Sequence, residues 1–255
     1  MSPAWLASVA FFIYCALVAA WRLDVAARRT FIGSAAGLIL ALGWGLVTQW
    51  PLLDEWVLPP LILLVAYWTS GTLYTRSMPA AERALMAFDR RLAIPQIAGR
   101  TPRWAAEFLE AAYASVYPLI PSALAIHLWL TPEPDAGRFW AVILLTDYIC
   151  FGTLPWIQTR PPRALEPGPP WRSSARELNE RLLGTASIGV NTFPSGHAAE
   201  ALAAALLVIH APPLVVGMMM LMAVAITAGA VLGRYHYAAD ALAGFAVALG
   251  VWALT

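Results

Sequence analysis

The chain has 255 residues, of which 60% are hydrophobic types and only 12% are charged, and its mean hydropathy is +0.66. A soluble domain carries about a quarter charged residues, so this composition excludes a soluble or disordered protein and predicts a polytopic membrane protein. The formal net charge of +1 argues against nucleic acid as a partner.

Eight stretches are apolar and long enough, or nearly so, to cross a bilayer core of about 30 Å as helices of about 20 residues. They are residues 4–21, 31–49, 56–74, 106–130, 138–156, 195–211, 213–232 and 237–255. We therefore expect an all-α, polytopic membrane helix bundle of about eight spans. The sixth stretch is short, so we expect its start to lie slightly inside the membrane boundary.

Residues 80–93, between the third and fourth expected spans, have a helical pattern that is too polar to cross a membrane. Leu85, Phe88 and Leu92 share one helical face, and most of the charged residues of this stretch lie elsewhere. This pattern predicts an amphipathic helix in the membrane interface.

The basic residues are distributed unevenly between the two sides of the predicted bundle. All 16 are arginine, and with eight spans only Arg138 falls on the side opposite to the others. The positive-inside rule makes the arginine-rich side cytoplasmic.

The first polar cluster that could carry chemistry follows the fifth expected span, where residues 159–163 read Thr-Arg-Pro-Pro-Arg. Arg160 and Arg163 lie on a turn stiffened by proline, and two guanidinium groups there can clamp an anion with several donors. The alternative is that both arginines anchor the chain at the membrane surface.

The second polar cluster is residues 191–197, Asn-Thr-Phe-Pro-Ser-Gly-His, where the sixth expected span begins. Ser195 suits a helix start, Gly196 lets an anion approach the backbone, and free N–H groups at a helix N-terminus bind anions. His197 can donate or accept a proton near neutral pH. The alternative is a capped helix start with a histidine at the level of the lipid headgroups.

The third polar cluster lies between the last two expected spans and contains Arg234, His236 and Asp240. His236 and Asp240 are four residues apart and share a helical face. Asp240 can therefore hold one imidazole nitrogen and leave the other as a nucleophile or base, although a purely structural His–Asp contact is the alternative. All three clusters fall on the arginine-rich side, and together they contain the groups that a covalent phosphoryl transfer needs.

With these residues the chain resembles the type 2 phosphatidic acid phosphatase superfamily of membrane lipid phosphatases. Residues 194–197 match its Pro-Ser-Gly-His motif fully. Arg160 and the proline after it match the end of Lys-x6-Arg-Pro, and His236-x3-Asp240 matches the end of Ser-Arg-x5-His-x3-Asp. The order and spacing of the three motifs along the chain also fit.

The sequence departs from the family motifs at two places. Thr153 stands where the first motif has lysine, and Arg163 offers a substitute for that missing cation. Arg234 lies two residues before His236 rather than six. These features look more like the branch that includes inositol phosphorylceramide synthase and its bacterial relatives. That branch contains head-group transferases as well as phosphatases, so the acceptor stays open between water and another alcohol.

The resemblance covers about the last six spans. It implies a six-span phosphatase-like catalytic core at residues 51–255, preceded by a two-span extension at residues 1–50. The implied activity is hydrolysis of a lipid phosphate monoester or diphosphate, and the alternative is transfer of a phosphorylated head group to an alcohol. A non-catalytic binder of anionic lipid is disfavoured because both histidines and Asp240 are present.

The implied mechanism begins with attack of His236 on the lipid phosphate, which gives a phosphohistidine. Asp240 orients His236, and His197 protonates the leaving lipid oxygen and then activates water. The groups expected to hold the phosphate are Arg160, Arg163, Arg234 and the backbone of Ser195 and Gly196. We expect no metal and no cofactor, and the expected partners are the lipid phosphate substrate and the surrounding membrane lipids. No oligomeric state is predicted.

The side of the membrane that the site faces is open between two arguments. The family's active site usually faces away from the cytoplasm. The charge rule instead places the three motifs on the cytoplasmic side of what we expect to be a bacterial inner membrane.

Two acidic residues are expected inside the membrane. Glu200 lies three residues after His197 on the same helical face, and Asp147 lies within the fifth expected span. Each could contact an arginine of the clamp or the substrate, or could belong to a structural pair.

Overall fold

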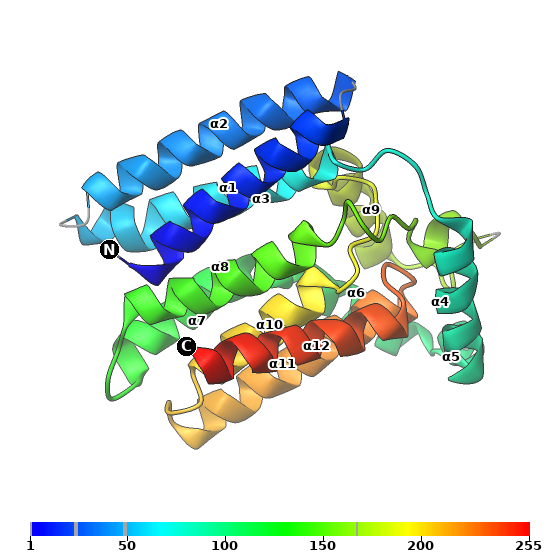
Figure 1. Ribbon diagram of the computed structural model, residues 1–255. Coiled ribbons are helices and arrows are strands. Elements are labelled where there is room, and N and C mark those ends of the chain that lie inside the picture. Colours follow the sequence, from blue (N-terminus) through cyan, green and yellow to red (C-terminus); the bar gives the residue numbers. More distant parts are fainter. Residues whose placement is uncertain (1, 23–24, 48–49, 167) are drawn as a thin grey trace.

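Figure 1 shows the computed structural model, which describes residues 2–22, 25–47, 50–166 and 168–255. The described residues are all-helical and form no strands, which confirms the expected all-α bundle. In chain order the helices are α1 (Pro3–Arg22), α2 (Val25–Leu46), the π-helix η1 (Leu52–Val57), α3 (Leu58–Gly71), α4 (Pro79–Arg91), α5 (Ile94–Arg100), α6 (Arg103–Ala114), α7 (Val116–Leu130), α8 (Ala136–Gly152), the 3-10 helix η2 (Pro162–Ala164), α9 (Ser174–Ala186), α10 (Gly196–Leu207), α11 (Pro213–Leu232) and α12 (Ala238–Leu254).

Each of the eight expected spans contains a helix, but the helices differ in length. Within the described residues, α1, α2, α11 and the segment Leu52–Gly71 are long and apolar enough to cross a membrane. The pair α6 and α7, bent by 61°, forms a fifth candidate. The remaining helices α8, α10 and α12 have 17, 12 and 17 residues. The protein is therefore multi-pass, with four or five candidate spans by length and composition.

Helix α10 lies at the centre of the bundle and contacts α7, α8, α11 and α12. Six of its fully buried residues are alanines, at positions 198, 199, 201, 203, 204 and 205. Small side chains let neighbouring helices approach closely, so this composition suits a central position. At 12 residues, α10 is only about 18 Å long at 1.5 Å per residue, shorter than a bilayer core of about 30 Å.

A glycine fixes the contact between α12 and the start of α10. A Cβ atom placed on Gly244 of α12 would lie 2.6 Å from the backbone oxygen of Ser195. Only glycine therefore permits this approach of the two helices. The contact brings the first turn of α12, which carries Asp240, next to the first turn of α10.

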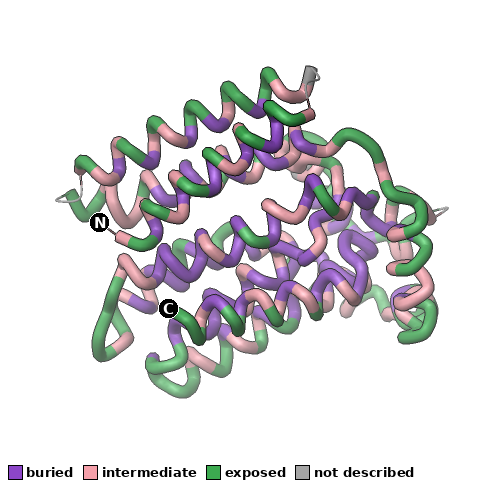
Figure 2. The backbone as a smooth tube through the Cα atoms, in the orientation of Figure 1, coloured by how far each residue is buried: buried purple, intermediate pink, exposed green. Residues whose placement is uncertain are grey.

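Helices α1 and α2 form an outer layer that packs through α1 against α8 and through α2 against α3 (Figure 1). Large apolar side chains on their outer faces, among them Leu17, Ile32 and Ile39, are more than 60% exposed. The burial colouring of Figure 2 shows this as recurrent exposed positions along both helices. An apolar outer surface of this extent suits contact with lipid.

The amphipathic helix expected at residues 80–93 forms as α4, but its buried face differs from the expectation. The fully buried side chains of α4 are the acidic Glu82 and Asp89, whereas Leu85 and Phe88 are half-buried and Leu92, just after the helix, is exposed. Inside the protein, α4 therefore buries its acidic side chains rather than its apolar face. Helix α4 packs against α12 and α5, and both of its buried carboxylates pair with arginines of the site region, as described below.

Candidate active site

Backbone contacts join the three polar clusters of the sequence at one end of the bundle. The N–H of Asn191 donates to the carbonyl of Thr159 at 3.0 Å, and the Asn191 side chain donates to the Thr159 hydroxyl at 3.0 Å. The N–H of Ser195 donates to the carbonyl of Asp240 at 2.9 Å. The first cluster is thereby connected to the second, and the second to the third.

The two histidines meet where these segments converge. His197 lies in the first turn of α10 and His236 lies in the loop between α11 and α12. Their ring centroids are 5.5 Å apart, with an angle of 51° between the ring planes. Both side chains line the same cavity, so one phosphorus atom could contact both rings.

Asp240, in the first turn of α12, lies beside His236, but His236 precedes that helix, so the two residues do not share the helical face that their spacing predicts. The distance from His236 Nδ1 to Asp240 Oδ2 is 3.5 Å, which is longer than an optimal hydrogen bond. Asp240 Oδ2 also accepts the backbone N–H of Tyr237 at 2.9 Å, and this fixes the carboxylate. Burial and the nearby positive charge of Arg163 lower the pKa of His236 to about 3. The imidazole is therefore neutral at neutral pH, as a nucleophile requires.

Arg163 is the predicted phosphate-binding arginine that lines the cavity. Its backbone N–H donates to the carbonyl of Arg234 at 3.0 Å, and its guanidinium carbon lies 4.9 Å from the centre of the Tyr235 ring. Among the residues that the structure describes, no carboxylate lies within ion-pairing distance of Arg163. Its positive charge is therefore available to an anion in the cavity.

Arg160 points away from the cavity and is engaged by Glu82 of α4. Its Nε and Nη2 atoms donate to the two carboxylate oxygens of Glu82, each at 2.9 Å. These charge-assisted hydrogen bonds lower the pKa of Glu82 below its usual value. The structure does not bring the Arg160 side chain to the histidines.

Arg234 is also engaged by carboxylates, and its side chain is 1% exposed. It forms ion pairs of 2.6 Å with Asp89 of α4 and 2.6 Å with Glu166, and it does not line the cavity. Its backbone lies in the left-handed region, with φ of 63°, which is uncommon for a residue other than glycine. The two ion pairs hold this turn, so Arg234 positions the loop that carries His236.

The start of α10 offers unpaired backbone N–H groups to the cavity. In the described part of the chain the N–H groups of Gly196 and His197 have no acceptor, whereas the N–H of Ser195 is used by Asp240. The Ser195 hydroxyl accepts the N–H of Ala198 at 3.3 Å as a helix cap. The amides left free for an anion are therefore those of Gly196 and His197, whereas Ser195 caps the helix and does not line the cavity.

Thr153 occupies the position at which the family's first motif has lysine. Its hydroxyl donates to the carbonyl of Phe193, so it ties the end of α8 to the segment before α10. It does not line the cavity. This position therefore has a structural contact here, and Arg163 is the predicted arginine that lines the same cavity as the two histidines.

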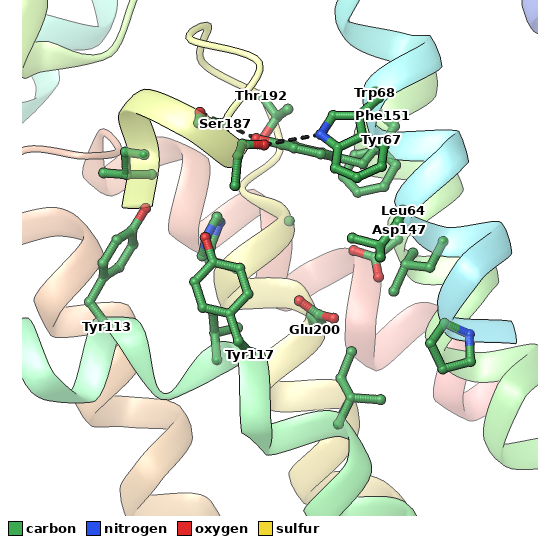
Figure 3. Close-up of a pocket in the computed structure, with 18 of the residues that line it drawn as sticks. Leu64, Tyr67, Trp68, Tyr113, Tyr117, Asp147, Phe151, Ser187, Thr192 and Glu200 are labelled. Atoms are coloured by element: carbon green, nitrogen blue, oxygen red, sulfur yellow. Dashed lines mark hydrogen bonds between the residues drawn. The ribbon is translucent and has the colours of Figure 1, made fainter. Parts of the chain in front are cut away.

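The cavity has a volume of about 480 Å³ and extends from the histidines deep into the bundle. Its walls come mainly from α3, α7, α8 and α10, and apolar side chains line most of its length down to Trp140 and Trp56. In Figure 3, Asp147 and Glu200 point into the cavity between Tyr117 and the helix that carries Leu64. The structure therefore brings both membrane-embedded acids to the cavity, below the histidines.

The segment after α9 covers one side of the cavity mouth. The Trp68 indole of α3 donates to the carbonyl of Ala186 at 3.1 Å, and the Tyr67 hydroxyl accepts the N–H of Ile188 at 3.1 Å. Figure 3 shows Ser187 and Thr192 beside Tyr67. Residues 186–192 therefore connect α3 to the second cluster over the cavity.

An aromatic stack behind His197 was not identified from the sequence. The Tyr113 ring lies 5.0 Å from the His197 ring and 4.2 Å from the Tyr235 ring, nearly parallel to both. The Tyr235 hydroxyl donates to Glu110 at 2.7 Å, and Glu110 pairs with Arg176 at 2.9 Å. This buried network fixes the rings against which His197 packs. In the sequence, only the position of Tyr235 next to His236 could have indicated this aromatic stack.

The described residues contain no group of three or more His, Cys, Asp or Glu side chains arranged to hold a metal ion. The side chains at the polar end of the cavity that could contact a phosphate are instead the Arg163 guanidinium and the two imidazoles. This arrangement can bind a phosphate and present an imidazole nitrogen to its phosphorus atom.

Comparison with known proteins gives one match. No curated protein and no protein of solved structure matches the chain. The sequence profile of the PAP2 superfamily matches residues 76–254, which include all three motifs. Membership of this superfamily implies a phosphatase or phosphotransferase of the PAP2 type. Because the match covers well over half of the chain, the chain belongs to the PAP2 superfamily.

Proposed function

We propose that this protein is a membrane-embedded lipid phosphatase that hydrolyses a lipid phosphate through a phosphohistidine at His236. One observation carries the proposal: His197 and His236 lie 5.5 Å apart, ring to ring, at the polar end of a deep, mostly apolar cavity. A phosphate at the histidines leaves the apolar remainder of the cavity for the lipid chain.

The first chemical step transfers the phosphoryl group from the lipid to His236. Because Nδ1 faces Asp240, Nε2 is the nitrogen that forms the bond to phosphorus, while the bond from phosphorus to the lipid oxygen breaks. The negative charge of the bound phosphate favours a protonated His197, which donates its proton to that leaving oxygen, so that the lipid departs as an alcohol. Asp240 retains the proton on Nδ1 and stabilises the positive charge that develops on the ring.

The second step returns the enzyme to its starting state. His197, now neutral, accepts a proton from water, whose oxygen attacks the phosphorus while the Nε2–P bond breaks. Arg163 and the N–H groups of Gly196 and His197 bind the equatorial phosphate oxygens in both steps. In this proposal Arg160 and Arg234, which carboxylates engage, position the surrounding loops rather than bind phosphate.

The runner-up is a phosphotransferase in which an alcohol replaces water in the second step. The sequence features that favour it are Thr153 in place of lysine and the compressed Arg-Tyr-His-Tyr at residues 234–237. The same residues would catalyse both reactions, since only the acceptor differs. We also propose that residues 1–50 are an extension to a catalytic core at 51–255.

A phosphate-release assay on a panel of lipid phosphates tests the proposal. Purified protein is given each lipid in detergent micelles, first in water alone and then with added long-chain alcohols, and inorganic phosphate and phosphorylated alcohol are measured. Release in water supports the phosphatase, and turnover only with an alcohol supports the transferase. No turnover of any lipid phosphate would contradict both.

We further propose that the site faces the cytoplasm of a bacterial inner membrane, because the arginine-rich side carries it. The test is a cysteine introduced by Arg28→Cys, near the start of α2 on that side. A reagent that cannot cross the membrane should label this cysteine only in broken cells. Labelling in intact cells would place the site outside.

A further inference from the structure

Two carboxyl groups within the apolar bundle have no role in the proposed reaction. Asp147 of α8 and Glu200 of α10 both line the cavity, and Figure 3 shows their carboxyl groups between Tyr117 and Leu64. Asp147 is only 1% exposed, and neither of its carboxyl oxygens has a hydrogen-bond partner among the described residues. Among the residues that the structure describes, Glu200 forms no ion pair.

An unpartnered carboxyl group at such a depth requires an explanation. Buried polar groups in proteins almost always have hydrogen-bond partners, and ionisable residues inside a membrane usually mark a functional site. Asp147 is not packed away from the cavity, because its Oδ1 lies 3.6 Å from the position of a Cβ on Gly196. The carboxyl therefore faces the start of α10, where a ligand would pass.

The depth of the pair relative to the phosphate site is set by α10. Glu200 follows His197 by three residues, which is about 4.5 Å along a helix that rises 1.5 Å per residue. Four covalent bonds separate phosphorus from an oxygen on the second carbon of its alcohol, and such a chain spans about 4–5 Å. A hydroxyl at that second carbon would therefore reach the level of the pair.

The chemistry of the pair suits an uncharged hydroxyl. Two adjacent carboxyl groups in an apolar cavity disfavour two negative charges, so they hold at least one proton between them. Such a pair offers both a donor and acceptors, and a hydroxyl is itself a donor and an acceptor. An ammonium group would instead bring a further charge that must be desolvated.

We propose that Asp147 and Glu200 form a second polar subsite that binds a free hydroxyl on the second carbon of the lipid whose phosphate lies at His236. The subsite selects lipid phosphates with this hydroxyl over analogues in which it is missing or esterified. The proposal rests on the proposed function, because it takes the phosphate position from that function. Asp147 and Glu200 are specificity-determining residues in this account, and neither contacts the phosphorus atom.

A matched pair of substrates tests the subsite directly. Phosphate release is measured with 1-acylglycerol 3-phosphate and with its 2-deoxy analogue, which has the same chain and phosphate. We expect kcat/KM to be about tenfold to a hundredfold higher for the hydroxylated lipid, because the deoxy analogue leaves a buried polar group unpaired. Equal values for the wild-type protein would overturn the proposal without any variant.

Variants assign the preference to the pair. Glu200→Leu and Asp147→Leu should bring the ratio of the two kcat/KM values close to one, mainly through slower turnover of the hydroxylated lipid. Thr146→Val is the matched control, because Thr146 is a fully buried neighbour of Asp147 on α8 that does not line the cavity. It should keep the wild-type ratio. Retention of the full preference in both leucine variants would contradict the assignment.

A binding measurement separates this proposal from the proposed function. Thermal stabilisation by 1-monoacylglycerol is compared with stabilisation by its 2-deoxy analogue, which requires no turnover. Stabilisation that depends on the hydroxyl and on Glu200, without phosphate release from any lipid, would support the subsite and refute the phosphatase. Phosphate release would support the phosphatase. If neither this release nor the thermal stabilisation depended on the hydroxyl, the subsite would be refuted.

Two further assays test whether Asp147 and Glu200 bind something other than the hydroxyl of the substrate. The deoxy lipid phosphate is supplied together with 1-monoacylglycerol. Phosphorylated monoacylglycerol formed in a Glu200-dependent way would assign the hydroxyl to an acceptor, and would overturn its assignment to the substrate itself. A higher kcat/KM for a 2-amino analogue than for the hydroxylated lipid would show that the pair binds an ammonium group, and would overturn the hydroxyl assignment.

Discussion

The cavity and the loop region beside it both contain arginines predicted to bind phosphate, but the surroundings of these arginines differ. In the cavity, Arg163 has no carboxylate partner among the described residues and lies near both histidines. Beside the cavity, Arg160 pairs with Glu82, and Arg234 pairs with Asp89 and Glu166. An arginine whose donors are already bound by carboxylates is not available to a substrate phosphate. The comparison therefore separates a substrate-binding cation from cations that hold the loops in place.

The largest expected loss of activity comes from removal of the nucleophile. His236→Ala should lower phosphate release by at least about 100- to 10,000-fold, since it removes the group that attacks phosphorus. The matched control is His210→Ala, because His210 is exposed at the other end of α10 and should keep full activity. Both variants are measured as purified protein, with the thermal transition recorded to confirm folding. Normal turnover of His236→Ala would remove the basis of the mechanism.

The next effect tests the difference between the two kinds of arginine. Arg163→Ala should lower kcat/KM roughly 100- to 1,000-fold, as is typical when one donor to a developing charge is removed. Arg160→Ala should lower it far less, because its guanidinium already binds Glu82. Steady-state kinetics of both variants on one lipid phosphate decide this point. A larger loss for Arg160→Ala than for Arg163→Ala would reverse the assignment.

Loss of a buried ion pair beside the cavity should lower the stability of the fold more than it lowers kcat. Asp89→Asn leaves the fully buried Arg234 with one of its two carboxylates, and removal of one partner of a buried pair typically costs about 3–5 kcal/mol. We expect a clearly lower thermal transition, while the kcat of the folded fraction stays close to that of the wild type. A loss of kcat without a loss of stability would instead favour a direct role of Arg234 at the phosphate.

The smallest expected effect concerns the partly exposed Arg160–Glu82 pair. Because the pair lowers the pKa of Glu82, its stabilising contribution is present above the unfolded carboxyl pKa of about 4.3. The contribution is lost as the pH falls through the lower pKa of the folded protein. Wild type should therefore melt slightly above Glu82→Gln at pH 7, and the difference should vanish in acid. A difference that grows as the pH falls would contradict this sign.

The helices and the motif positions were largely predictable from the sequence. Each of the eight apolar stretches contains a helix, and the fourth contains two, α6 and α7, bent by 61°. The four-residue spacing of His236 and Asp240 predicted that they lie together, and they do, although His236 precedes α12. These predictions succeed because they depend on local periodicity and on spacing within one segment.

The contacts that assign roles to the arginines could not be predicted in the same way. Asp89 and Arg234 are 145 residues apart in sequence, and nothing local indicates that α4 turns its carboxylates toward the site. Likewise, the bond from Ser195 to the Asp240 carbonyl depends on the packing of α12 against α10. Local patterns identify which groups are present, whereas long-range packing decides which of them remain free.

The most direct test of the central claim is to trap the phosphoryl group on the protein during turnover. A lipid with a radiolabelled phosphate is mixed with the purified enzyme, the reaction is quenched in alkali, and the labelled residue is identified by peptide mass spectrometry. We expect label on His236 and none in His236→Ala. His197→Ala lacks both the acid of the first step and the base of the second, so its label on His236 should form slowly and also be lost slowly. Label on His197, or an unlabelled wild-type protein under rapid turnover, would contradict this mechanism.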